Sequence, residues 1–196
     1  EKIAALGICG SGGFALSAAA MDTRIRAVVT ASMFDMSAAA RLGMTPQQIQ
    51  ERKEMLSLQR WQDAENGEPE YIPSYGEEAV EEIPDEIQGL WREFFEFYGT
   101  KRGHHPNARG NFTTTSDLSF LNYSLTDHID EISPRPILFC VGEQAESRFM
   151  SDMAFEKAAE PKQMLVVKDC NHIDLYDNTS KIPFDEIERF LHESLE

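Results

Sequence analysis

The feature that most constrains the fold lies within the first 31 residues, where two apolar runs flank a glycine-rich turn and an alanine-rich segment. Residues 2–8 predict a short buried strand, and residues 25–31, which are rich in β-branched side chains, predict a second one. Between them, residues 9–13 predict a tight turn and residues 14–21 a helix that starts directly after it. Strand, short turn, helix and strand make one βαβ unit of a parallel sheet.

The same alternation returns near the C-terminus. Residues 136–141 and 163–167 predict strands, and residues 147–159 and 184–195 predict helices. Four buried strands interleaved with helices indicate an α/β architecture, a mostly parallel sheet flanked by helices, within one domain that spans residues 1–196.

The intervening stretch, residues 37–128, follows a different pattern. It predicts a helix over residues 47–61, with Thr45 as N-cap and Pro46 at the first position, and a second helix over residues 84–98. We interpret residues 37–128 as a helical cap or lid insertion into the α/β domain.

Charge and cysteine content exclude several classes of partner. The chain carries 34 acidic and 18 basic side chains, a net charge of −16, which opposes binding to nucleic acid or anionic membranes. No apolar run approaches the roughly 20 residues of a membrane span. The three cysteines, Cys9, Cys140 and Cys170, are odd in number and lack C-x-x-C spacing, which favours a reducing compartment and predicts a cytoplasmic protein.

The glycine-rich turn at residues 7–13 is the first candidate for chemistry. A nucleophile on a sharp strand-to-helix turn needs small residues two positions before and after it, and Cys9 satisfies this rule with Gly7 and Ser11. Ser11 satisfies it as well, with Cys9 and Gly13. Cys9 is favoured because its turn directly follows the predicted strand. The Gly10 amide, at the start of the next helix, would then stabilise an oxyanion.

A base and an acid are needed beside the nucleophile. His172 lies in the loop after the last predicted strand, from which it can reach back over the strand ends as a general base. Glu146, after the 136–141 strand, and Asp35, after the 25–31 strand, are the two candidates for the acid that orients the imidazole. No set of His, Cys and carboxylate residues has metal-ligand spacing, and we expect neither a metal nor an organic cofactor.

With these residues in place, the chain resembles the α/β-hydrolase superfamily. The order nucleophile, acid, histidine is that of the superfamily. The run Gly-Ile-Cys-Gly-Ser-Gly-Gly is similar to the elbow of dienelactone-hydrolase-like members from bacteria, which use cysteine. In this chain Ala145 stands where that family has its aspartate.

The resemblance implies hydrolysis of a carboxylic ester, a lactone or a related small acyl compound through a covalent acyl-enzyme and a catalytic triad. A catalytically inactive relative that serves as a binding or scaffold protein is the alternative, because the usual aspartate is missing. A nucleotide-binding module ranks last, since no lysine lies near the turn.

The family's first four strands precede the elbow, whereas this chain opens at Glu1 without a Met and enters a strand at once. We therefore expect that upstream sequence is missing. Four strands alone would expose a sheet edge, so we expect it to be covered by an N-terminal partner chain or by a second copy.

Overall fold

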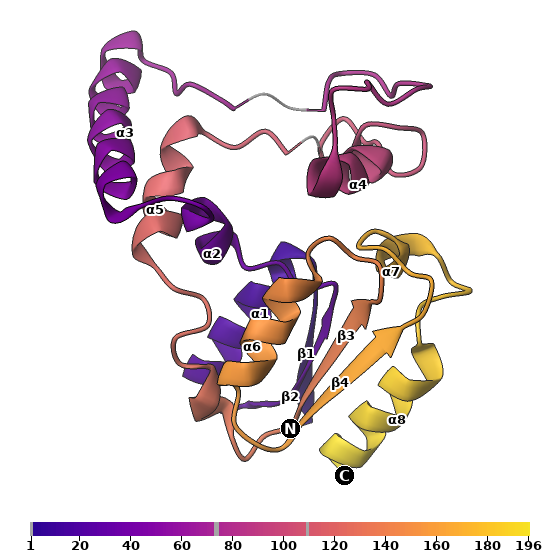
Figure 1. Ribbon diagram of the computed structural model, residues 1–196. Coiled ribbons are helices and arrows are strands. Elements are labelled where there is room, and N and C mark those ends of the chain that lie inside the picture. The colour runs from indigo at the N-terminus through magenta and orange to yellow at the C-terminus, as the bar shows by residue number, and fades with distance from the viewer. Residues whose placement is uncertain (1, 73–74, 109) are drawn as a thin grey trace. The chain divides into compact units, whose positions relative to one another are not determined.

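The computed structural model describes residues 2–72, 75–108 and 110–196, and divides the chain into two compact units (Figure 1). The first unit comprises the residues up to Met36 together with Leu125–Glu196, and the second comprises Ser37–Ser124. The α/β pattern belongs to the first unit. The lid role predicted for residues 37–128 stays a prediction.

The first unit is built on a parallel sheet. In the described part of the chain this sheet has four strands in the order β1-β2-β3-β4, and their bounds are Ile3–Ile8, Ile25–Ala31, Ile137–Gly142 and Lys162–Val167. Each strand pairs in parallel with its neighbour, and Ile8 lies opposite Ala31 at the end of the first pair. The predicted fold class, a parallel sheet flanked by helices, is confirmed.

Helices cover both faces of this sheet (Figure 1). Helices α1, Gly10–Met21, and α6, Arg148–Lys157, lie on one side, and α8, Phe184–Leu195, lies on the other. Because strand side chains alternate between faces, one set of residues forms a core beneath α8. That core comprises Ala27, Val29, Ala31, Leu138, Cys140, Cys170, Leu175, Ile187 and Phe190.

Helix α1 begins at Gly10, four residues before the predicted start. The glycines of the turn are therefore part of the helix, because this end of α1 packs too closely for side chains. A Cβ at Gly12 would lie 2.9 Å from the Met33 side chain, and one at Gly13 would lie 3.0 Å from Leu125. The short distances place α1 directly against the chain that follows β2.

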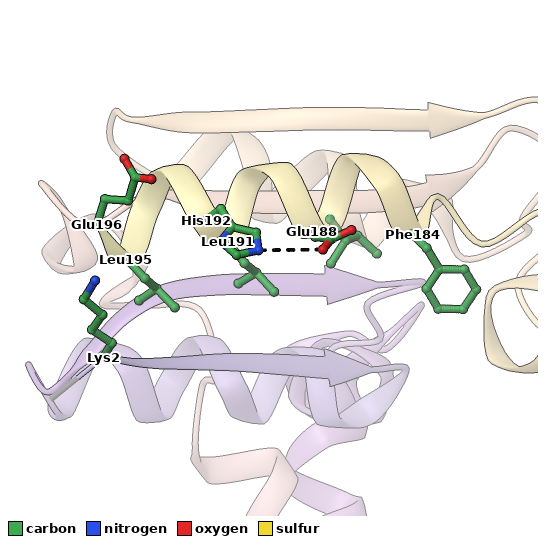
Figure 2. A pocket seen from close by; sticks show the side chains of 8 residues that line it. Lys2, Phe184, Glu188, Leu191, His192, Leu195 and Glu196 are labelled. Carbon is green, nitrogen blue, oxygen red and sulfur yellow. Dashed lines mark ion pairs between the residues drawn. The ribbon is translucent and has the colours of Figure 1, made fainter.

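Strand β1 is an edge strand, and the prediction that it is buried was wrong. Ile3, Leu6 and Ile8 are 42%, 49% and 38% exposed. The reason is its place in the sheet, since β1 pairs with β2 alone within the described residues. A groove of about 510 Å³ runs beside it, lined by Lys2 and by α8 residues that include Phe184, Leu191 and Leu195 (Figure 2).

The second unit is mainly helical. It contains α2, Met36–Arg41, most of which lies in this unit, α3, Pro46–Asn66, α4, Gly89–Tyr98, and α5, Asp117–Asn122. The predicted cap of α3 is confirmed: Thr45 Oγ1 accepts a hydrogen bond from the Gln48 backbone, and the Gln48 side chain accepts one from the Thr45 backbone. Helix α4 starts five residues later than predicted, because Gly89 has a φ of +57° that interrupts a right-handed helix.

Candidate functional site

The carboxyl ends of the four parallel strands meet at one edge of the sheet. Cys9 follows β1 there, and His172 lies in the loop between β4 and the short helix α7, Asp174–Asp177. Ligands of open α/β sheets bind at this edge. Parallel topology thus brings together two residues that are far apart in the sequence.

Cys9 sits on a strained turn between β1 and α1. Its φ and ψ are 55° and −126°, a conformation that non-glycine residues seldom adopt and that clusters at functional sites. The turn is fixed by a hydrogen bond from the Cys9 amide to Ala31 O, 3.0 Å, and by two bonds to Cys9 O, from the amides of Gly12 and Phe34, each 2.9 Å. Both neighbouring segments therefore hold the backbone of Cys9.

Gly7 explains how the strand and helix approach one another. A Cβ at this position would lie 2.2 Å from the backbone oxygen of Ser11, so only glycine fits. Ser11 itself lies in the first turn of α1 and is exposed. The arrangement places Cys9, with Gly7 before it, at the apex of the turn.

Two donors contact the sulfur of Cys9. The backbone N–H of Gly10 and the hydroxyl of Tyr176 both form hydrogen bonds with it, and both lower the pKa of the thiol. Burial acts in the opposite direction and is the larger effect, so the pKa of Cys9 is raised above its usual value. The resting side chain is therefore a neutral thiol.

His172 is fully buried behind Tyr176. Its Nε2 atom is 2.9 Å from the Tyr176 hydroxyl, and its Nδ1 atom forms a short hydrogen bond with the Ser147 hydroxyl. Ser32 Oγ donates to His172 O at 2.7 Å, which fixes the backbone against the end of β2. Burial lowers the pKa of His172 to about 3, so the imidazole is neutral.

The segment that carries His172 and Tyr176 is held by a small polar network. The amides of Asn171 and Asp174 each donate to the other residue's side chain, at 3.1 and 3.0 Å. The Asp174 carboxylate also forms an ion pair with Lys181 at 2.7 Å. These bonds fix α7, and with it the position of the Tyr176 hydroxyl.

The two candidate acids lie in different surroundings. Asp35 is buried, and its Oδ2 accepts a hydrogen bond of 3.3 Å from Thr126. Glu146 is exposed, next in sequence to the Ser147 that contacts the imidazole. The roles of Glu146 or Asp35 as orienting acid, and of Cys9, Ser11, His172 and Gly10 in catalysis, stay predictions.

Sequence reasoning missed Tyr176 and Ser147. Tyr176 stands four residues after His172, a spacing that brings two side chains to one face of a helical turn, and this signal was available. Ser147 had no such signal, since a serine two residues after Ala145 is unremarkable until the fold places it beside the imidazole.

Two further properties bear on the class of site. Among the described residues, no group of three or more His, Cys, Asp or Glu side chains is arranged to hold a metal ion. None of the helices in that part of the chain is long and apolar enough to cross a membrane.

Two bacterial proteins are similar to this chain in sequence. The uncharacterized protein PA2218 of Pseudomonas aeruginosa is 45% identical over 202 residues, which cover 100% of this chain and 53% of PA2218. The uncharacterized protein YcjY of Escherichia coli is 28% identical, over 92% of this chain and 60% of YcjY. The chain thus spans little more than half the length of these relatives. No family model matches it.

Solved structures identify the fold. The crystal structure of PA2218 has a TM-score of 0.88 at 43% identity and covers 100% of this chain and 61% of its own. The α/β hydrolase GrgF from Penicillium sp. sh18 has a TM-score of 0.71 at 23% identity, covering 97% and 63%. A thermophilic esterase from Thermogutta terrifontis has a TM-score of 0.56 at 16% identity, covering 100% and 66%. The chain has the α/β-hydrolase fold, of which it supplies part.

Proposed function

We propose that this protein hydrolyses carboxylic esters, lactones or related small acyl compounds, with Cys9 as the nucleophile and His172 as the general base. The observation that carries the proposal is the hydrogen-bonded connection from the Cys9 sulfur through Tyr176 to His172 Nε2, at the carboxyl edge of the sheet. A thiol on a strained turn, backed by an imidazole from a distant loop, is the arrangement that nucleophilic catalysis requires.

The structural relatives support the reaction class. GrgF is an α/β hydrolase and the Thermogutta protein is an esterase, and both share the fold that positions Cys9 and His172. A cysteine at the elbow agrees with the dienelactone-hydrolase-like subgroup to which we assign the chain. The proposed substrate is a small acyl compound.

The proposed reaction begins from a neutral thiol and a neutral imidazole. The thiol proton passes to His172 while the sulfur attacks the substrate carbonyl, and the carbonyl oxygen gains the negative charge. The Gly10 N–H, which already points at the sulfur, is placed to donate to that oxygen. The C–O bond of the ester then breaks, and the alcohol leaves with the proton from His172.

Water completes the cycle. It attacks the thioester carbonyl and gives a proton to His172, which returns it to the departing sulfur, so the acid is released and the thiol is restored. Glu146 and Asp35 are the proposed alternatives for a carboxylate that stabilises the transient imidazolium. Ser11 is the alternative nucleophile.

An inactive relative with a binding or scaffold role is the second candidate. It is favoured by the electrostatics of the site, because burial keeps both Cys9 and His172 uncharged. A thiol of raised pKa is a weak nucleophile until a base removes its proton.

Activity of variants made in the complete gene product decides between these functions. We expect hydrolysis of p-nitrophenyl acetate, butyrate or a simple aryl lactone, and a loss of about 10³-fold or more in Cys9→Ala. Ser11→Ala is the matched control and retains activity within about threefold. Mass spectrometry of the quenched reaction should find the acyl group on the peptide that contains Cys9.

Two results contradict the proposal. Loss of activity in Ser11→Ala with retention in Cys9→Ala assigns the nucleophile to Ser11. Failure of the wild-type protein to hydrolyse any of these compounds, with no acylated Cys9 peptide, favours the inactive relative.

A further inference from the structure

We propose that the Tyr176 hydroxyl relays the proton from the Cys9 thiol to His172 Nε2, so that this site transfers its proton through three side chains. The inference rests on the function proposed above and adds a catalytic residue to it. Tyr176 qualifies because its hydroxyl contacts the reacting sulfur as well as the base.

The geometry places the hydroxyl between nucleophile and base. Its oxygen is 2.9 Å from His172 Nε2 and forms a hydrogen bond with the Cys9 sulfur. The two rings meet edge to face, with centroids 5.4 Å apart and planes at 69°. Nε2 is the nitrogen that has to receive the thiol proton, and the hydroxyl already occupies its coordination direction.

The protonation pattern is consistent with a one-way relay. A neutral imidazole has one N–H donor and one acceptor nitrogen. If Nδ1–H donates to the Ser147 hydroxyl, Nε2 accepts from the Tyr176 O–H, and the Tyr176 oxygen accepts from the Cys9 S–H. Every hydrogen bond in the line then points from the sulfur toward the imidazole.

The step conserves protons and charge. The S–H bond breaks as its proton joins the Tyr176 oxygen, and the Tyr176 O–H bond breaks as its proton joins Nε2. The products are a Cys9 thiolate, a neutral Tyr176 and a His172 imidazolium, whose Nδ1–H stays on Ser147. No other reactant is required.

The hydroxyl is held in place by the protein backbone. Tyr176 belongs to α7, which is fixed by the reciprocal bonds between Asn171 and Asp174 and by the ion pair of Asp174 with Lys181. Phe34 packs its ring 6.3 Å from that of His172 on another side of the imidazole. A fixed hydroxyl is preorganised for transfer.

A double-mutant cycle on Cys9 alkylation tests the relay without any substrate. The variants are Tyr176→Phe, His172→Gln and the pair of both in the complete gene product, and the readout is the rate of iodoacetamide addition to the Cys9 peptide. If Tyr176 is the link, each single variant slows alkylation by about tenfold or more, and the double variant is no slower than either. Tyr123→Phe, an exposed tyrosine, is the matched control and keeps the wild-type rate.

Additive effects of the two substitutions, or an unchanged rate in Tyr176→Phe, overturn the relay. Equal melting temperatures of wild type and Tyr176→Phe exclude unfolding as the cause of a slow rate.

A proton inventory on wild-type acylation gives an independent answer. Rates in mixtures of H₂O and D₂O should curve as expected for two protons in flight, and should become linear in Tyr176→Phe, with little change in KM. A linear wild-type plot overturns the relay even where Cys9 is acylated. Absence of any acylation, by contrast, contradicts the proposed function, and the alkylation cycle still decides whether Tyr176 links the two groups.

Discussion

Backbone strain is concentrated around the candidate site. Among the described residues, the non-glycine residues with positive φ are Cys9, Ser32 and Asp169, at 55°, 46° and 51°. Each comes shortly after a strand of the sheet, and Ser32 and Asp169 accept the strain where they hold the His172 loop: Ser32 Oγ donates to His172 O, and Lys181 donates to Asp169 O. Residues in such conformations persist only where their surroundings fix them, which links the strain to the positions of the nucleophile and the base.

The buried imidazole makes stability depend on pH. The pKa of His172 is about 3 in the folded protein against 6.5 for an ordinary histidine, so between these values the unfolded chain binds more protons than the folded one. Its contribution is therefore complete above about pH 6.5 and is lost as the pH falls toward 3. At about pH 5 the loss is about 2 kcal/mol.

Urea unfolding at about pH 5 and about pH 8 measures this effect. The free energy of unfolding should fall by about 2 kcal/mol more in wild type than in His172→Gln over this interval. His192→Gln, on the exposed side of α8, is the matched control and keeps the wild-type dependence. Identical pH dependence in wild type and His172→Gln contradicts the burial of a neutral imidazole.

At the scale of elements, local pattern and chain order predict most of the first unit. Apolar runs bounded by turn residues give all four strands, and the glycines around Cys9 give the elbow. The base follows from its place after the last strand. Helix α7, only four residues long, lacks a periodic signal, and the Tyr176 and Ser147 contacts depend on how distant elements pack, which no local pattern encodes.

The turn between β1 and α1 allows a matched pair of substitutions. Gly7→Ala forces a Cβ to within 2.2 Å of a backbone oxygen, whereas Gly10→Ala places one 3.5 Å from the flexible Met36 side chain. We expect Gly7→Ala to lower the free energy of unfolding by about 3 kcal/mol, and Gly10→Ala to change it by less than about 1 kcal/mol. Urea denaturation measures both, and equal values would contradict the close approach of strand and helix.

The N-terminus of α3 provides a separate test in the second unit. Thr45→Ala removes the hydroxyl that accepts from the Gln48 amide and should cost about 1 kcal/mol. Ser57→Ala, in the middle of the same helix, removes a hydroxyl bonded to Lys53 O and should be neutral or stabilising. Thermal unfolding followed by circular dichroism compares the two variants, and a larger loss in Ser57→Ala would argue against the cap.

At the scale of the whole chain, the open edge of the sheet is the least self-sufficient feature. Ala4 packs into the core beneath α8, and Leu6 shares its face of β1 but is 49% exposed. The groove of Figure 2 continues this apolar surface along α8 through Leu191 and Leu195. An edge with unpaired backbone groups and exposed aliphatic side chains is a template for another strand.

We propose that this edge is covered by an N-terminal partner chain or by a second copy. Residues 1–196 expressed alone should then associate as concentration rises, which sedimentation velocity measures directly. Leu6→Lys places a charge on the edge and should restore a monomer, because a buried unpaired lysine opposes strand addition. Met21→Lys, at a residue 78% exposed at the end of α1, is the control and should associate like wild type. A monomer at every concentration, without the substitution, would show that the edge is protected by other means.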